Sequence, residues 1–185
     1  FRFDSTPSAN RLHWWMHSQE SGAGTNQGLM LGTRYSATPA NNGVECRCNS
    51  SAATFGAGAF TPGTTYHAAC VFCGANSTVG DCAGKAAGTV CAYLDGNLLS
   101  CASALAANTT TMAAAYIGQT IDTGDGQNAL TIEELRAWDD IRTPTELAAN
   151  DHCRLGAGAA NLLSLWGMRD QSSGTIASQA VEDAD

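Results

Sequence analysis

The sequence predicts an all-β fold, an antiparallel two-sheet sandwich of jelly-roll type with one short helix near residues 144–149. Three observations lead to this class. Many short segments alternate apolar and polar residues, turn-forming residues separate them at regular intervals, and one segment carries a clear helix-start signal. A length of 185 residues suits one well-buried core, so we expect residues 1–185 to form a single domain, a piece of a longer secreted protein.

The clearest strand of the first half covers residues 11–17. Alternation places Leu12, Trp14 and Met16 on one face, which we expect to join the core. The opposite, outward face then carries Arg11, His13, Trp15 and His17. Further strands are expected at residues 28–35, 44–48 and 66–73, with a loop or irregular edge at 54–63 and a long glycine-rich excursion at 74–88.

The second half opens with a predicted hairpin at residues 90–100, because Asp95-Gly96 supplies the positive-φ turn that joins two antiparallel strands. The alanine-rich run after the hairpin contains poor helix formers at residues 108–111, so we expect a loop followed by a strand. In the next strand, Ile132 and Leu135 lie out of phase. A slip beside Glu133, most simply a β-bulge, would bring both to one core.

A short helix is predicted after this strand. Thr143 can cap it, Pro144 suits its first position, and Glu146 completes a capping box. We expect about two helical turns, followed by a closing strand at residues 162–168.

Cysteines and glycosylation sequons indicate an extracellular, oxidising environment. The chain has eight cysteines, and N-x-S/T sequons place candidate glycans on Asn49, Asn76 and Asn108. An even cysteine count together with three sequons favours the secretory route, so we expect a secreted or cell-surface protein.

Two disulfides follow from the expected elements, because the hairpin places Cys91 opposite Cys101 and a Cys73–Cys82 bond would close the glycine-rich excursion. Cys46 and Cys48 share one side of a strand and cannot easily bond each other. Each is expected to pair with one of the two remaining cysteines, Cys70 or Cys153. A tetrahedral zinc site built from the two closely spaced cysteine pairs is the alternative, and it would leave four cysteines without a role.

The strand and helix near the C-terminus resemble a known family. Ile132-Glu133-Glu134-Leu135-Arg136-Ala137-Trp138 and Arg142-Thr143-Pro144-Thr145-Glu146 are similar to the penultimate strand and short helix of laminin-G-like and pentraxin-like domains. These domains belong to the concanavalin A-like lectin/glucanase superfamily. Weaker similarities lie at the Asp95-Gly96 hairpin and at Tyr116-Ile117-Gly118, so the resemblance covers roughly the last hundred residues. It implies a sandwich fold and carries no reaction with it.

Charge excludes two classes of partner. The net charge is −8 and Lys85 is the single lysine, so no basic patch is available for nucleic acid or for an anionic membrane. No apolar run is long enough to cross a bilayer, and no membrane insertion is expected.

Carboxylates at Glu133, Glu134, Asp139 and Asp140 raise the question of a glycoside hydrolase, since the superfamily includes glucanases. The superfamily's Glu-x-Asp-x-x-Glu catalytic motif is absent, and no Gly-x-Ser-x-Gly nucleophile turn is present. We therefore expect no enzyme, and these carboxylates are interpreted as solvated charges or salt-bridge partners.

Two candidate binding sites remain. The outward row of the first strand is expected to lie beside a second outward row, and exposed tryptophans with polar neighbours suit a sugar; this site comprises Arg11, His13, Trp15, His17, Glu134, Arg136 and Trp138. The alternative is that a loop or a neighbouring domain covers the tryptophans. The second site is the oxygen-rich loop 122–128, where Asp122 and Asp125 would bind calcium, a cation that the family resemblance also implies; a plain turn is the alternative.

These features predict a non-catalytic extracellular module for recognition of a glycan or a glycoprotein, for adhesion, or for assembly of an extracellular structure. A purely structural building block of a filament or matrix, which would assemble with itself or with further domains, is one alternative. A glycoside hydrolase of the glucanase branch is the other.

Overall fold

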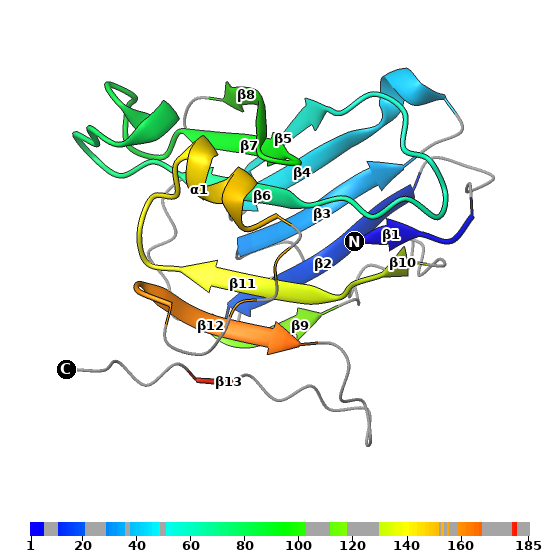
Figure 1. Cartoon of the computed structure of the whole chain (residues 1–185). Coiled ribbons are helices and arrows are strands. Elements are labelled where there is room, and N and C mark those ends of the chain that lie inside the picture. Colours follow the sequence, from blue (N-terminus) through cyan, green and yellow to red (C-terminus); the bar gives the residue numbers. More distant parts are fainter. Residues whose placement is uncertain are drawn as a thin grey trace.

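The computed structural model describes residues 1–5, 11–20, 29–35, 38–48, 51–102, 112–117, 130–151, 153, 155, 159–167 and 179–180. This part of the chain consists mostly of short antiparallel strands. They are accompanied by helix α1 (Pro144–Ala149) and two 3-10 turns, η1 (Pro39–Asn41) and η2 (Gly80–Cys82) (Figure 1). The prediction of an all-β class is confirmed.

The largest sheet has five strands in the order β5-β4-β3-β2-β9. They are β2 (Arg11–Glu20), β3 (Leu29–Tyr35), β4 (Gly43–Cys48), β5 (Ser51–Gly56) and β9 (Met112–Ile117), and each neighbouring pair is antiparallel. The expectation of a loop or irregular edge at residues 54–63 is wrong for residues 54–56, which belong to β5. Alanine, serine and glycine residues mark a strand poorly, although Phe55 is buried.

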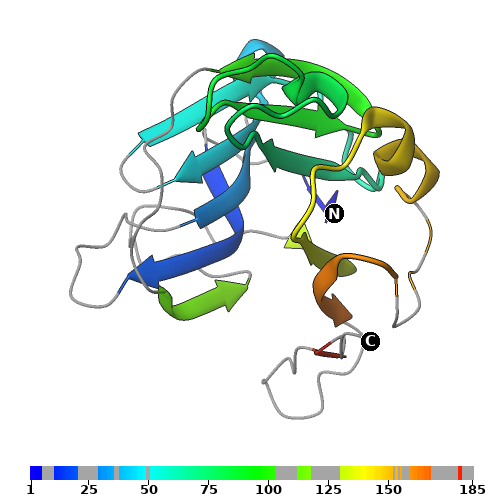
Figure 2. The ribbon, with the colours of Figure 1, turned by 90° about the vertical axis from the view of Figure 1, so that its left-hand side faces the viewer.

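Two three-stranded antiparallel sheets, in the orders β6-β7-β8 and β11-β12-β13, lie in front of the large sheet in Figure 1. Their strands are β6 (Ala68–Phe72), β7 (Val90–Leu94), β8 (Asn97–Ala102), β11 (Glu134–Trp138), β12 (Leu162–Gly167) and β13 (Gln179–Ala180). Figure 2 shows the large sheet as one layer and the smaller sheets as a second layer facing it. A short pair, β1 (Arg2–Phe3) with β10 (Leu130–Thr131), lies beside them.

Part of the core lies between these layers. Val44 and Phe55 of the large sheet pack against Val90 and Ala92 of β7, and all four side chains are buried. Burial of each larger apolar side chain contributes about 1.5–3 kcal/mol. The Cys46–Cys70 disulfide joins β4 to β6 and thus fixes one layer to the other.

An aromatic cluster forms a second part of the core. It consists of Phe1, Phe3, Trp15, Tyr35 and Phe60. The Phe1 and Trp15 ring centroids lie 4.3 Å apart, and those of Phe3 and Tyr35 lie 4.2 Å apart. The Tyr35 hydroxyl donates a hydrogen bond of 3.1 Å to the Phe60 carbonyl, so its polar end is satisfied inside the cluster.

The burial of Trp15 overturns one prediction. Its side chain is 4% exposed, so the expectation that it faces outward is wrong. The pairing of β2 with β3 shifts at this point, because Trp14 lies opposite Gly32 while Met16 lies opposite Leu31. Trp15 is the extra residue of this β-bulge, and a bulge breaks the alternation on which the prediction rested.

The predicted hairpin is confirmed as β7 and β8 joined at Asp95-Gly96, which have φ angles of 49° and 73°. Gly96 is required for a second reason. A Cβ atom there would lie 2.5 Å from the Cβ of Ala148, so the hairpin approaches α1 too closely for any side chain.

Helix α1 and its capping box are also confirmed, with Thr143 as the N-cap and Pro144 at the first position. In the strand before it, a break replaces the predicted bulge, because β10 ends at Thr131 and β11 begins at Glu134. Ile132 packs on the aromatic cluster, and Leu135 is buried.

Three disulfides are present among the described residues. Cys73–Cys82 and Cys91–Cys101 confirm the predicted pairs, and Cys46–Cys70 is one of the pairings left open for Cys46. Cys153 is exposed and free, and the side chain of Cys48 lies outside the described part. Three disulfides indicate an oxidising, extracellular-type environment.

Candidate functional site

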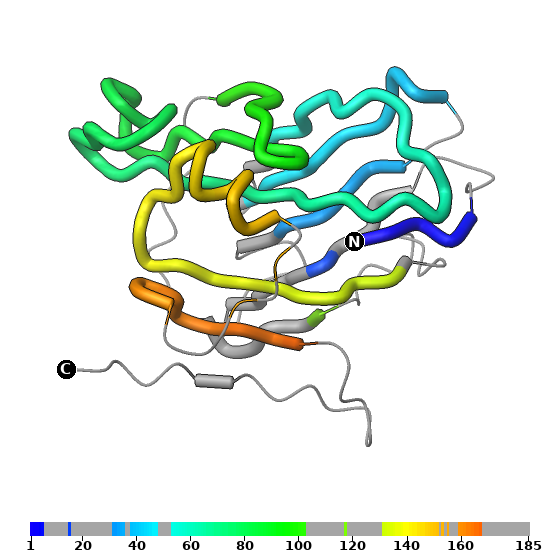
Figure 3. Tube along the Cα trace, in the orientation of Figure 1, coloured from blue at the N-terminus to red at the C-terminus, as the bar shows by residue number. Residues whose placement is uncertain are grey.

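Strands β6 and β11, from the two small sheets, line a cavity of about 630 Å³. Figures 1 and 3 show where these two strands run in the front layer. Trp15 and Leu31 of the large sheet line the cavity together with Phe1, so both layers contribute to its walls. Its size falls within the range of small-molecule and peptide sites, about 300–1,000 Å³.

Four of the seven residues predicted to bind a ligand line this cavity. Trp15 comes from β2, while Glu134, Arg136 and Trp138 come from β11. The structure therefore brings two distant predicted segments together, although Trp15 takes part as a buried residue. The side chains of Arg11, His13 and His17 lie outside the described part of the structure.

Arg136 holds β11 to the segment after α1. Its Nε donates to Glu134, its Nη1 donates to the Asn150 carbonyl over 2.7 Å, and its Nη2 donates to the Cys153 carbonyl. These bonds occupy all three nitrogens of the guanidinium. We therefore assign Arg136 to organising the cavity wall, a role that leaves ligand contacts to its neighbours.

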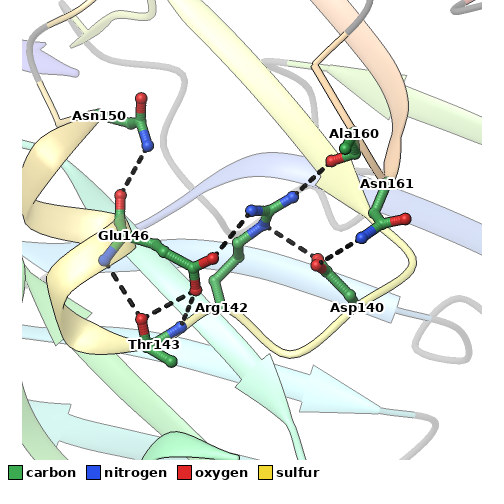
Figure 4. Close-up of polar contacts among 7 residues, drawn as sticks. All are labelled: Asp140, Arg142, Thr143, Glu146, Asn150, Ala160 and Asn161. Atoms are coloured by element: carbon green, nitrogen blue, oxygen red, sulfur yellow. Dashed lines mark hydrogen bonds and ion pairs between the residues drawn. The ribbon is translucent and has the colours of Figure 1, made fainter.

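Arg142 organises the next turn of chain in a similar way (Figure 4). Its guanidinium lies 2.9 Å from Asp140 Oδ1, donates to Glu146 Oε1 over 3.3 Å and donates to the Ala160 carbonyl over 2.7 Å. The same guanidinium carbon lies 3.7 Å from the centre of the Trp138 ring, a cation–π contact. One face of Trp138 is thus covered by Arg142.

Two buried polar atoms beside the cavity lack hydrogen-bond partners. They are Trp15 Nε1 and His67 Nδ1, and both residues line the cavity. An unsatisfied buried donor or acceptor costs about 1–3 kcal/mol, and such groups are few in native proteins.

His67 is neutral at physiological pH. Burial, with a smaller contribution from the positive charge of Arg136, lowers its pKa from 6.5 to about 4. No motif in the sequence marked His67, and the same is true of Phe1 and Tyr66, which also line the cavity. They come together through tertiary contacts between segments that are distant in sequence.

The lining of the cavity is acidic. Two guanidinium groups face six carboxylates: Glu133, Glu134, Asp139, Asp140, Glu146 and Asp151. Hydrogen bonds from the backbone and hydroxyl of Thr143 lower the pKa of Glu146, whereas the general acid of a glycosidase needs a raised pKa. Glu134, Asp140 and Glu146 all form ion pairs with arginine. These contacts fit the interpretation of the carboxylates as structural charges.

Among the predicted glycosylation and calcium-binding residues, only Asn76 lies in the described part of the structure. Asn76 is exposed in a turn with a φ of 58°, while Asn49, Asn108, Asp122 and Asp125 lie outside the described residues. Glycosylation and calcium binding therefore stay predictions.

The sulfur atoms of Cys73, Cys82 and Cys91 lie within 4.8 Å of one another, a spacing compatible with a metal site. They belong to two neighbouring disulfides. A metal requires thiolates, which disulfide sulfurs do not provide, so this cluster holds the hairpin and the glycine-rich excursion together.

Comparisons of the chain with models of known protein families, with curated proteins and with solved structures found no match. Among the described residues, no helix is long and apolar enough to span a bilayer.

Proposed function

We propose that this protein is a non-catalytic extracellular module that recognises a glycan or a glycoprotein through the cavity lined by β6 and β11. The observation that carries the proposal is the combination of aromatic walls with polar and charged side chains around one cavity. Binding sites typically combine apolar walls with a few polar groups that orient the ligand. Three disulfides support an extracellular location.

The fold supports placing the chain among laminin-G-like and pentraxin-like domains. Two facing layers of antiparallel strands fit the jelly-roll sandwich of those domains. The capped helix directly after the Arg136-containing strand matches the motif on which the resemblance rests. On this proposal the chain is one sandwich domain of a longer secreted protein.

The structural building block remains a second candidate, because β6 and β11 both end a sheet on the side that faces the cavity. Open sheet edges allow strands of other chains to pair with them. Such a protein would assemble into a larger structure without a soluble ligand.

Binding of the purified protein to arrayed glycans, in calcium and again in chelator, tests the recognition proposal. A panel of secreted glycoproteins, before and after enzymatic removal of their glycans, forms the second arm. We expect saturable binding in at least one arm. Trp138→Ala should weaken this binding, because it removes part of the cavity wall.

Leu163→Ala is the matched control, since Leu163 is 53% exposed on β12 and lies away from the cavity. It should bind as the unaltered protein does. Absence of binding in both arms would contradict the recognition proposal and favour the building block. Release of reducing sugar from a β-glucan would instead favour the hydrolase.

A further inference from the structure

We propose that Cys101 is a modification site for low-molecular-weight thiols, and that Cys91 passes the reaction on to the neighbouring Cys73–Cys82 disulfide. The proposal concerns the two disulfides of the β7–β8 hairpin and the glycine-rich excursion, and it does not depend on any ligand of the cavity. It is carried by the positions of three buried sulfur atoms and by the partial exposure of a fourth cysteine.

The first step concerns how an external thiol reaches these two disulfides. Cys73, Cys82 and Cys91 are buried. Cys101 is half-buried on β8, which is the last strand in the order β6-β7-β8. A thiolate attacks one sulfur of a disulfide and expels the other, so access helps to decide which sulfur is attacked. The external thiolate therefore attacks Cys101 and expels Cys91.

The second step concerns the sulfur that is expelled. The Sγ atoms of Cys73, Cys82 and Cys91 all lie within 4.8 Å of one another, and these atoms form the three-sulfur cluster. Once Cys91 is a thiolate, a second disulfide thus lies next to it. Holding two reacting groups in place makes their reaction intramolecular and raises its rate strongly. Cys91 therefore attacks the Cys73–Cys82 disulfide.

The third step decides between the two sulfurs of that disulfide. The Cys73 amide donates to the carbonyl of Thr89 over 2.8 Å, and Thr89 lies two residues before Cys91. Cys73 and Cys91 are thus diagonal neighbours across the β6–β7 ladder, where such residues lie about 7–8 Å apart, whereas a disulfide joins Cα atoms about 4.4–6.8 Å apart. Cys82 lies outside the sheet, and the Cys91 sulfur lies 4.0 Å from the carbonyl oxygen of the adjacent Asp81. We therefore expect a Cys82–Cys91 bond.

The thiols and disulfides balance over the whole reaction. The external thiol gives its proton to water, and its sulfur forms a mixed disulfide with Cys101 as the Cys91–Cys101 bond breaks. Cys91 then bonds Cys82, and Cys73 leaves as a thiolate that takes up a proton from water. Two disulfides are present before and after, so no further oxidant or reductant is required. The reaction frees β8 from its covalent bond to β7, while the excursion stays attached through Cys82.

Mass-spectrometric mapping of the unaltered protein tests these steps. The free thiols, Cys153 among them, are first blocked with N-ethylmaleimide, and the excess reagent is removed. The folded protein is then treated with glutathione, and new thiols are labelled in denaturant with an excess of isotopically heavy N-ethylmaleimide. Peptic digestion in acid follows, because thiols without charge do not exchange. We expect the glutathione adduct on Cys101 and the heavy label mainly on Cys73.

Two single substitutions form a matched pair, because each leaves one half of the Cys91–Cys101 bond as a free thiol. In Cys101→Ser the free thiol is Cys91, which belongs to the three-sulfur cluster, whereas in Cys91→Ser it is Cys101, which does not. N-ethylmaleimide labelling of Cys73 should therefore be at least about tenfold stronger in Cys101→Ser. A Cys82–Cys91 crosslinked peptide should also appear in Cys101→Ser without any added thiol.

The Cys46–Cys70 disulfide is the internal comparison within the same protein. Cys70 is also half-buried, but neither of these two sulfurs belongs to the three-sulfur cluster. A thiol that opens this bond should therefore be expelled again by Cys46, and no rearranged pair should form.

The proposal is overturned if glutathione modifies Cys73, Cys82 or Cys91 in preference to Cys101. It is also overturned if Cys101 is modified while the Cys73–Cys82 bond stays intact, or if the two variants label Cys73 equally. A protein whose disulfides react only after denaturation would overturn it as well. If the variants fail to fold, the glutathione experiment still decides, because it requires no substitution.

Discussion

At the scale of the single residue, Trp15 of β2 belongs both to the aromatic cluster and to the lining of the cavity. Its ring lies against Phe1 within the aromatic cluster, and its Nε1 is buried without a partner beside the cavity. The residue therefore has two contributions. Its ring packs in the aromatic cluster, and the residue also forms part of the cavity wall.

Substitutions of Trp15 separate these contributions. Trp15→Ala should lower the free energy of unfolding by about 3–5 kcal/mol, because a buried aromatic side chain is lost. Trp15→Phe keeps most of the packing and changes the cavity wall, so it should cost less than Trp15→Ala and still weaken ligand binding. Urea denaturation and a binding titration measure the two effects. Equal stability of Trp15→Ala and the exposed-site control Leu163→Ala would contradict the burial of Trp15.

His67 gives stability a pH dependence. Its pKa is about 4 in the folded protein and about 6.5 in the unfolded chain, so between these values the unfolded chain binds more protons. The contribution of His67 to stability is therefore fully present above pH 6.5 and is lost as the pH falls toward 4, by up to about 3 kcal/mol. Urea denaturation at a series of pH values measures this slope.

His67→Gln provides the control, because glutamine does not titrate in this range. The variant should show a smaller fall in stability between pH 6.5 and 4. Its carboxylates should still lose stabilising contacts at lower pH, as expected for Glu146, whose pKa is lowered. An unchanged slope in His67→Gln would assign the pH dependence to other groups.

At the scale of elements, helix α1 depends on its cap. The Glu146 amide donates to the Thr143 hydroxyl over 3.3 Å, and the Thr143 amide donates to Glu146 Oε2 over 2.8 Å. Thr143→Ala removes the hydroxyl and should cost about 1 kcal/mol of stability. Thr145→Ala is the control at an exposed helical position, where alanine should cost nothing. A loss as large in Thr145→Ala would show that the cap is not the cause.

The same elements explain what the sequence could predict. The helix with its cap, the Asp95-Gly96 hairpin and the Cys91–Cys101 pair depend on signals within about ten residues, and local chemistry decides them. Trp15 was misplaced because its bulge depends on how β2 meets β3. Register between strands is a tertiary property that alternation alone does not fix.

The candidate site also contains residues that local signals mark and residues that only tertiary contacts bring together. Arg136 and Trp138 were marked by the strand and helix motif, whereas nothing local marked His67 or Phe1. Trp15 and β11 line one cavity, but the prediction that Trp15 faces outward is wrong, and a shared role in ligand binding stays a prediction. The two segments meet around a cavity between layers, and the expected outward platform does not include the buried Trp15.

At the scale of the whole molecule, one disulfide among the described residues joins the two layers. Cys46–Cys70 joins the large sheet to β6, and the other two bonds fix the hairpin and the excursion beside it. The sheet formed by β11, β12 and β13 carries no disulfide in the described part. It is held at the cavity by the side-chain bonds of Arg136 and by the packing of Ile132. This sheet is therefore the part of the molecule whose position a ligand in the cavity would stabilise most.

Calcium binding should change the stability of the whole molecule. If calcium binds at Asp122 and Asp125, it stabilises the folded state alone and should raise the melting temperature. At a calcium concentration about one hundred times the dissociation constant, binding adds about 2.7 kcal/mol to the free energy of unfolding. Calorimetric melting in millimolar calcium and in chelator measures the shift.

Paired substitution of Asp122→Asn with Asp125→Asn should abolish the calcium-dependent shift in melting temperature, because neutral amides are weaker ligands than carboxylates. Asp139→Asn, which removes an exposed carboxylate beside the cavity, is the control and should leave the shift intact. Identical melting curves in calcium and chelator would contradict the prediction, and a shift lost only in Asp139→Asn would place the cation at the cavity instead.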